Sequence, residues 1–294
     1  MRARLPDRAD VVDAEGWVSR DGVTVHYERH GSGAPTVVLL PTWSLVHSRH
    51  WKFQVPYLAR HFTVLTFDGR GCGRSDRPAG PAAYRAAEFA ADALAVMDAT
   101  ETERAVLVSV SRGALWSLRL CAENPDRVLG AAFVAPGVPL APPLPERRVQ
   151  RFDDVIDNPV GWEKYNAHHW KSDYRDFVEF FMGRVFIEGH STKQYEDAVG
   201  WALEIDPATL VASDRGLEDC TPPAVARLAK RVRCPVLVIH GSGDRLRSHA
   251  TAAALADRTG GALITLDGSG HFPHVRDPVR VNLLIRQFVE GITR

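Results

Sequence analysis

The sequence has few cysteines, and none of them stands in a metal-binding pattern. The four are Cys72, Cys121, Cys220 and Cys234, spread over 294 residues. None forms a Cys-x-x-Cys pair or lies at zinc-ligand spacing from a histidine, which argues against a structural zinc site. Such isolated cysteines are typical of reduced thiols in a cytoplasmic protein rather than of a disulfide scaffold. We therefore expect no metal.

The chain also lacks an excess of either charge and any long apolar run. Thirty-six basic residues balance 36 acidic ones, which argues against a nucleic-acid binder driven by phosphate neutralisation. The basic run 227–233 is short and typical of a solvated helix face. No apolar run approaches the roughly 18 residues of a membrane helix, and the charged N-terminus has no apolar core of a secretion signal. We expect a cytoplasmic protein that binds neither nucleic acid nor membrane.

What the chain does have is an alternation of short apolar strands with amphipathic helices. A hairpin turn is predicted at Asp21-Gly22, between two short alternating runs. The predicted strands are 36–41, 62–68, 104–110, 128–136, 235–241 and 262–268, and the predicted helices are 47–61, 83–101, 113–125, 248–260 and 278–291. Continuous apolar strands that alternate with helices indicate a mostly parallel sheet with helices on both faces.

The middle of the chain breaks this pattern. A proline-rich link begins after Gly137, and no buried strand is convincing between about 146 and 230. That stretch is helical in period and rich in aromatic residues. We interpret 138–230 as a helical cap inserted between two parts of one core, 1–137 and 231–294. Such a cap would cover the C-terminal edge of the sheet, where open α/β folds bind ligands.

Ser111 is the first candidate catalytic residue. It lies in Ser109-Val-Ser-Arg-Gly113, between a predicted strand and a predicted helix. A sharp strand-to-helix turn with small flanking residues exposes the serine oxygen, as in a nucleophile elbow. The alternative is that the serine belongs only to a turn.

An acid and a base follow in chain order. Asp244 comes a few residues after the strand 235–241, and His271 lies in a glycine-rich loop before the last helix. A carboxylate there could orient an imidazole, and histidine suits proton transfer near neutrality. Asp244 could instead cap a helix or turn, with Asp214 and Asp219 as other possible acids. His274 competes with His271.

These residues resemble the α/β-hydrolase superfamily along nearly the whole chain. The segment 67–78, FDGRGCGRSDRP, is similar to the family's D-x-R-G-x-G-x-S-x-x-P motif. SVSRG resembles the G-x-S-x-G elbow, HGSGD the acid loop and GSGHFPHVRDP the histidine loop. The resemblance implies an α/β-hydrolase fold with a cap, Ser111 as nucleophile, Asp244 as acid and His271 as base, in the family's order. The glycines of 69–73 then serve a tight turn rather than a nucleotide loop.

Two departures from the family pattern affect the site. Ser109 replaces the first glycine of the elbow, and Pro41-Thr42 stands where many members have His-Gly. By position, the backbone N–H groups of Trp43 and Arg112 would form the oxyanion hole. Proline fixes φ and has no N–H, so the loop could run differently, while the Thr42 hydroxyl could add a donor.

The expected reaction is hydrolysis of a carboxylic ester or lactone through an acyl-enzyme, without a metal or organic cofactor. An aromatic cap favours a small to medium, moderately apolar small-molecule substrate. Hydrolytic carbon–carbon cleavage of a diketone-like substrate, perhydrolysis of the haloperoxidase type and low-turnover binding remain alternatives, and a homo-oligomer remains open. The candidate substrate-binding residues are Thr42, Trp162, Trp170, Trp201 and Phe272. We expect the Arg112 guanidinium to pair with an acidic neighbour; a substrate carboxylate is the alternative partner.

Overall fold

The computed structural model describes residues 12–147, 152–190 and 192–292. Eight strands form one sheet in the order β1-β2-β4-β3-β5-β6-β7-β8. The strands are β1 (Ala14–Arg20), β2 (Val23–His30), β3 (Thr36–Leu39), β4 (Thr63–Phe67), β5 (Ala105–Val110), β6 (Val128–Val134), β7 (Val236–Gly241) and β8 (Ala262–Leu266). The N-terminal stretch 1–11, whose charge argues against a secretion signal, lies outside the described residues.

An antiparallel hairpin starts the sheet, and the strands from β4 to β8 pair in parallel. Asp21 and Gly22 join β1 to β2 with φ of 52° and 79°, which is the positive-φ geometry of a two-residue hairpin turn. Strand β2 then pairs antiparallel with β4. The register β3–β5 sets Leu39 opposite Val108, so the loops that follow these two strands leave the same edge. The predicted hairpin and mostly parallel sheet are confirmed.

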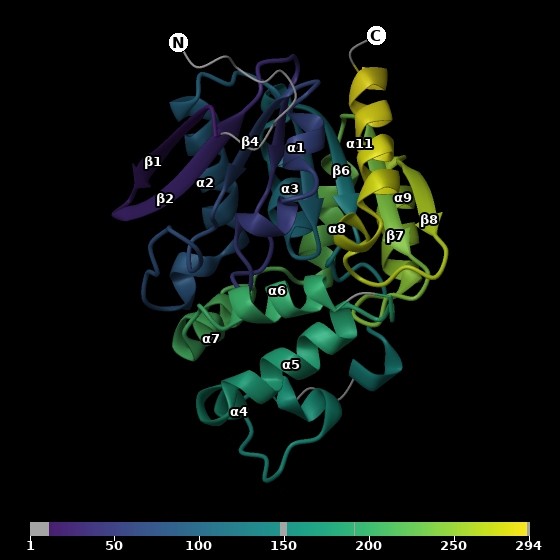
Figure 1. The fold of residues 1–294 in the computed structure, drawn as a ribbon. Coiled ribbons are helices and arrows are strands. Elements are labelled where there is room, and N and C mark those ends of the chain that lie inside the picture. The colour runs from purple at the N-terminus through teal and green to yellow at the C-terminus, as the bar shows by residue number, and fades with distance from the viewer. Residues whose placement is uncertain (1–11, 148–151, 191, 293–294) are drawn as a thin grey trace.

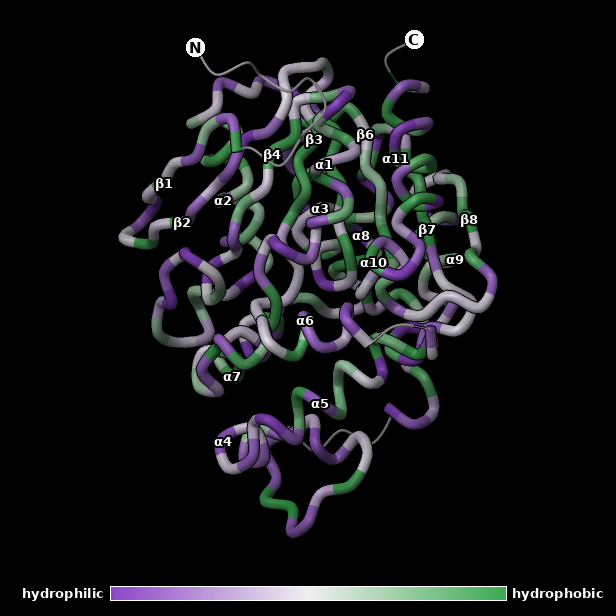
Figure 2. The backbone as a smooth tube through the Cα atoms, in the orientation of Figure 1, coloured by the Kyte–Doolittle hydropathy of each residue, from purple (hydrophilic) through white to green (hydrophobic). Residues whose placement is uncertain are grey.

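Helices cover both faces of this sheet, and alternate strand residues show it. In β3, Val37 and Leu39 belong to one apolar cluster, whereas Val38 belongs to another. The first cluster includes α1 (Val55–Leu58), α11 (Pro278–Ile292) and part of the insertion. The second includes α2 (Ala86–Ala99), α3 (Gly113–Glu123), α8 (Pro222–Arg231) and α9 (His249–Thr259). Figure 2 shows the apolar strands at the centre of the molecule.

The predicted helix 47–61, whose periodicity Pro56 breaks, is not one continuous helix in the structure. The structure has a 3-10 helix over Ser48–Trp51 and then the single turn α1. Pro56 stands at the start of α1, where its missing N–H costs nothing. The intervening Gln54 side chain is buried and donates to the carbonyl of His274 at 2.8 Å, so tertiary contacts interrupt the helix here.

The glycine-rich segment after β4 forms a tight turn, as the sequence predicts. Gly71 and Gly73 have φ of 94° and 56°, and a Cβ on Gly73 would lie 2.2 Å from a carboxylate oxygen of Asp68. Arg70 is buried and forms two hydrogen bonds with Asp92, at 2.7 and 2.6 Å. Arg70, from the glycine-rich segment, therefore holds the turn against α2 through Asp92.

Helices of the inserted segment lie below the sheet in Figure 1, at the end away from both termini. They are α4 (Ala167–Ser172), α5 (Tyr174–Val185), α6 (Lys193–Ala202) and α7 (Pro207–Arg215). Helix α8 falls within the predicted insertion 138–230 but packs against α3 and α9. The division into 1–137, 138–230 and 231–294 stays a prediction, and residues 148–151 and 191 lie outside the described part. None of the described helices is long and apolar enough to cross a membrane.

Candidate active site

Ser111 is the first residue of the two-residue turn between β5 and α3. Its φ is 52°, a left-handed conformation that side chains other than glycine adopt at a cost. Three backbone hydrogen bonds hold it there: its N–H donates to the Val134 carbonyl at 3.0 Å, and its carbonyl accepts from the amides of Gly137 and Ala114, at 2.7 and 3.1 Å. Strain of this kind in a fixed turn is typical of a functional position.

Small residues around Ser111 are required because backbone passes close by. A Cβ on Gly113 would lie 2.9 Å from the carbonyl oxygen of Pro41 and 3.2 Å from the Cβ of Ser109. A Cβ on Gly137 would lie 2.8 Å from the carbonyl carbon of Ser111. Ser109 itself is fully buried, so the serine fits where the family pattern has glycine.

The structure brings together the hydroxyl, imidazole and carboxylate that the sequence puts forward. His271 Nε2 lies 2.9 Å from Ser111 Oγ, and His271 Nδ1 lies 2.7 Å from Asp244 Oδ2. A carboxylate only accepts, so Nδ1 carries the proton and Nε2 is left to accept from the serine. The second oxygen of Asp244 accepts from the amides of Leu246 and Arg247, at 2.7 and 3.0 Å.

These contacts keep Asp244 ionised in a buried place. Burial opposes its charge, but the charge and hydrogen bond of His271 outweigh burial, with His240 and the Arg247 amide adding to them, and the pKa of Asp244 is lowered. The buried carboxylate can therefore stabilise an imidazolium. His274, the competing histidine, lies elsewhere: its Nε2 is 3.2 Å from His50 Nδ1.

The insertion fixes the loop that carries His271. The His271 amide donates to the carbonyl of Val185, the last residue of α5, at 3.2 Å. The Gly270 amide donates to the Glu188 carboxylate at 2.8 Å. The His271 ring also stacks on Phe272 at 5.5 Å. The position of the imidazole therefore depends on the end of a cap helix.

His240 is a neighbour of this site that the sequence analysis missed. It lies in β7, four residues before Asp244, and its Nε2 is 3.7 Å from Asp244 Oδ2 and 3.3 Å from the Arg247 carbonyl. Burial lowers the pKa of His240, so the ring is neutral near pH 7. A histidine just ahead of the predicted acid was the available signal.

Thr42 and Trp43, in the loop after β3, lie beside Ser111. The Pro41 carbonyl accepts from Trp116 Nε1 of α3 at 2.8 Å, which pins this loop to the helix that follows the serine. Within the described part of the chain, the amides of Trp43 and Arg112 have no hydrogen-bond acceptor. The Thr42 hydroxyl is buried and has no partner among the described residues. Three donors are thus unoccupied at the position where an oxyanion hole is predicted.

A small cavity of about 30 Å³ lies beside Ser111. Its lining residues are Thr42, Trp43, Leu45, Val46, Ser111, Phe181, Met182, Val185, Leu246, His271 and Phe272. Such a space holds one or two water molecules, so a substrate requires the cap side chains to move. Phe181, Met182 and Val185 of α5 form the cap side of this cavity, and none of them was singled out from the sequence.

Two of the predicted substrate-binding residues, Thr42 and Phe272, line the cavity, and three tryptophans do not. Trp170 is fully buried, with its ring 4.5 Å from that of Phe177 inside the cap. Trp162 lies under Arg147, and Trp201 packs on His47. Periodicity identified the cap helices, but it could not show which aromatic side chains turn toward the core.

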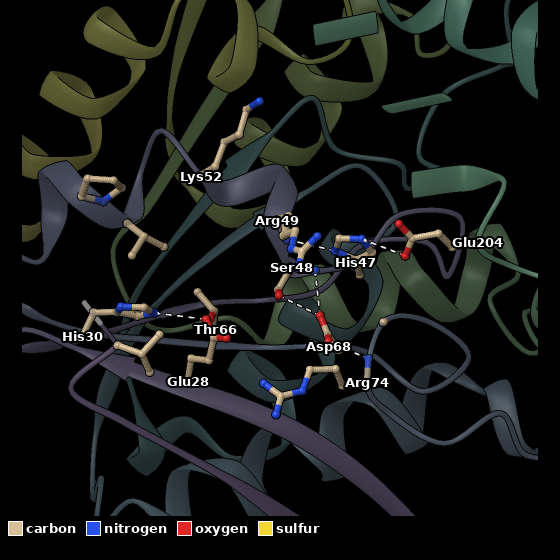
Figure 3. A pocket seen from close by; sticks show the side chains of 14 residues that line it. Glu28, His30, His47, Ser48, Arg49, Lys52, Thr66, Asp68, Arg74 and Glu204 are labelled. Carbon is tan, nitrogen blue, oxygen red and sulfur yellow. Dashed lines mark hydrogen bonds and ion pairs between the residues drawn. The ribbon is translucent and has the colours of Figure 1, made fainter. Parts of the chain in front are cut away.

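A second hollow of about 430 Å³ is larger and more open, and it contains none of Ser111, Asp244 and His271. Figure 3 shows contacts between some of its polar side chains. Asp68 accepts from the Ser48 hydroxyl at 2.7 Å, and His47 lies 3.5 Å from Glu204. Ser111 and His271 line the smaller cavity instead.

Arg112 pairs with an acidic neighbour, as expected. Its Nη2 donates to the Tyr165 hydroxyl at 2.6 Å and to the Asp214 carboxylate. The guanidinium lies 4.2 Å from the Trp43 ring. Burial opposes the charge, yet Tyr165 and Asp214 together raise the pKa of Arg112. The side chain therefore packs against the loop after β3 through Trp43.

Comparison with known proteins agrees with this architecture. The family model described as the alpha/beta hydrolase fold matches residues 35–278, and the chain belongs to this family. A candidate carbamate hydrolase, RutD of Caulobacter vibrioides, is 36% identical over 275 residues, covering 91% of this chain and 96% of that protein. A candidate non-heme chloroperoxidase of Synechocystis sp. is 28% identical over 284 residues, covering 91% and 95%.

Solved structures share the fold. Est816, described as an N-acyl homoserine lactone degrading enzyme, superposes with a TM-score of 0.74 at 25% identity, covering 93% of this chain and 100% of that one. The protein is an enzyme of the α/β-hydrolase class.

Proposed function

We propose that this protein is a serine hydrolase that cleaves a carboxylic ester or lactone through an acyl-enzyme. The observation that carries the proposal is the continuous contact from Ser111 Oγ through His271 to Asp244, at 2.9 and 2.7 Å. A hydroxyl, an imidazole and a buried carboxylate in this order make a nucleophile, a general base and its orienting group.

In the first step, His271 Nε2 takes the proton of Ser111 as the serine oxygen attacks the carbonyl carbon. The carbonyl π electrons move to oxygen, and the amides of Trp43 and Arg112 donate to that oxyanion, with Thr42 as a third donor. The intermediate collapses, and His271 gives its proton to the departing alkoxide. Water then attacks the acyl-enzyme with the same base and regenerates Ser111.

The apolar cavity supports a substrate whose reacting part is small to medium and moderately apolar. Aliphatic and aromatic side chains dominate the lining, and polar groups cluster only at Ser111. RutD and Est816 carry names of carbamate and lactone chemistry, and both reactions begin with attack on an acyl carbon. Their similarity supports acyl transfer without fixing the leaving group.

Perhydrolysis is the second candidate, because the Synechocystis relative carries a chloroperoxidase name. In that reaction hydrogen peroxide replaces water in the second step, His271 takes its proton, and the acyl group leaves as a peracid. An acetate ester assayed with and without added peroxide separates the two outcomes, since only perhydrolysis yields peracid.

The test of the main proposal combines labelling with turnover. A fluorophosphonate probe should label Ser111 stoichiometrically, and 4-nitrophenyl esters and lactones of graded chain length should be hydrolysed repeatedly. Ser111→Ala should lose labelling and at least about 10⁴-fold in kcat, whereas Ser19→Ala, at an exposed hairpin position, should keep both. Full activity in Ser111→Ala would disprove the assignment, and labelling without turnover would favour a binding role.

A further inference from the structure

Three arginines from separate segments gather beside the catalytic cavity. Arg112 follows Ser111 directly, Arg147 ends a 3-10 helix at the start of the insertion, and Arg247 comes three residues after Asp244. We call Arg112, Arg147 and Arg247 the arginine cluster. Arg147 thus belongs to the inserted segment, and Arg112 and Arg247 belong to loops that follow β5 and β7.

Contacts tie the arginine cluster to the cavity walls. Arg147 Nη1 donates to the carbonyl of Leu246 at 2.8 Å, and Leu246 lines the cavity. The Arg112 guanidinium covers the ring of Trp43, another lining residue, at 4.2 Å. Tyr165 connects the two arginines, because it accepts from Arg112 at 2.6 Å and its ring lies 5.8 Å from the Arg147 guanidinium.

Several donors of the arginine cluster have no acceptor. Arg112 Nη1 and Arg147 Nε are buried without any hydrogen-bond partner in the described part of the chain. The Arg247 guanidinium, which is only partly buried, also has no acceptor among the residues that the structure describes. Buried donors are almost always satisfied in a resting protein, so unpaired guanidinium N–H groups at one place indicate a missing acceptor.

The charges around the arginine cluster do not balance either. Two carboxylates face its three cations: Asp214, which pairs with Arg112, and Asp244, which pairs with His271. Burial, followed by Arg147 and Arg112, lowers the pKa of Arg247 to about 9. Burial and Arg112 also lower the pKa of Arg147. The arginine cluster therefore has one more cation than it has facing carboxylates.

We propose that the arginine cluster binds a carboxylate of the substrate, so that the enzyme acts on esters or lactones whose acyl part carries a second carboxylate. A planar guanidinium matches a carboxylate with two parallel N–H···O bonds. One carboxylate supplies the missing charge, and the apolar lining of the cavity suits the carbon chain between that group and the reacting carbonyl. This inference rests on the proposed function for its reaction and on the arginines for its ligand.

The kinetic test compares mono-4-nitrophenyl adipate with its methyl ester, which has the same chain without the charge. We expect the unmodified protein to favour the charged ester in kcat/KM by tenfold or more. Arg147→Gln and Arg247→Gln should each reduce that preference by about tenfold, mainly through KM, the size expected for a hydrogen bond to a charged group. Arg245→Gln removes an exposed arginine of the same loop and should leave the preference unchanged.

A binding measurement keeps the ligand separate from the reaction. Ser111→Ala protein, with the arginine cluster intact, should bind adipate in a calorimetric titration, and adding Arg247→Gln should weaken that binding. The carboxylate site would be overturned if the protein hydrolysed the neutral ester as well as the charged one and did not bind adipate. That result would still support the serine hydrolase proposal. Adipate binding without hydrolysis of either ester would do the reverse. Tighter binding of inorganic phosphate than of adipate would also overturn the carboxylate assignment.

Discussion

The two walls of the catalytic cavity are built in different ways. On the core side, Ser111, Thr42 and His271 sit on loops whose backbone is fixed by hydrogen bonds and by close approach at glycine. On the cap side, Phe181 and Met182 project from helix α5, and apolar side chains alone reach the cavity. One wall is defined by backbone geometry and the other by side-chain size.

This difference separates chemistry from selection of the substrate. A displaced donor or base costs transition-state stabilisation, because these groups work only in narrow geometry. A changed apolar side chain alters volume, which discriminates between substrates by a smaller amount. Substitutions on the core wall should therefore lower kcat for all substrates, and substitutions on the cap wall should change preference among them.

The largest expected effect is at Asp244, behind the core wall. Asp244→Asn should lower kcat by about 10⁴-fold, since an amide neither stabilises the imidazolium nor holds the required tautomer. Asp219→Asn is the matched control, because that exposed carboxylate lies 3.7 Å from Arg119 and away from the site. Steady-state kinetics on one ester would measure both, and a larger loss in Asp219→Asn would mean that the acid is misplaced.

The next largest loss of kcat is expected when the loop after β3, which carries the proposed oxyanion donors Thr42 and Trp43, is displaced. Gly113→Ala places a methyl group 2.9 Å from the Pro41 carbonyl and should push the loop away, lowering kcat by about 10²-fold with KM little changed. Gly200→Ala, in α6, meets no atom within 4 Å and should stabilise its helix by roughly 0.5–1 kcal/mol without loss of activity. Equal kinetics for the two variants would contradict the role of the loop.

Behind the core wall, a buried histidine pair should make stability depend on pH. Burial, with the charge of His47 adding to it, lowers the pKa of His50 to about 3, and burial, with His50 and His271, lowers that of His274 well below 6.5. The unfolded chain takes up these protons below about 6.5, so it binds more protons than the folded protein there. The free energy of unfolding is therefore fully present above 6.5 and falls as pH drops toward 3.

Urea unfolding between pH 8 and 5 measures this dependence. Each histidine should contribute up to about 1.4 kcal/mol per pH unit well below its unfolded pKa. His50→Asn should flatten the curve, whereas His168→Asn, at an exposed cap position, should not. A curve that is flat in the unmodified protein would show that the pair takes up protons without unfolding.

The smallest effect is expected on the cap wall. Met182→Ala enlarges the cavity and should shift the preference toward longer acyl chains by about tenfold, with kcat for the best substrate close to the original. Val178→Ala is buried in the same helix but does not line the cavity. Both variants should lose stability. If neither variant shifts the acyl-chain preference, or if both shift it equally, the cap wall does not select the substrate as proposed.

The same contrast explains what could be predicted from the sequence. Ser111, Asp244 and His271 follow strands, and a strand's end fixes which edge its next residue occupies, so their convergence was visible without coordinates. The cap wall was not, because Trp162, Trp170 and Trp201 look no different in period from Phe181 and Met182. The broken helix 47–61 was missed because the buried Gln54 forms its hydrogen bonds with residues far along the chain.

The hydrogen bond from the His271 amide to the Val185 carbonyl connects the end of α5 to the loop that carries His271. A ligand that displaces the end of α5 would therefore also displace the loop that carries His271. The full kcat would then require a ligand whose shape lets the end of α5 return to its position beside His271. Under the proposed mechanism, a ligand that keeps the end of α5 displaced would bind without being cleaved.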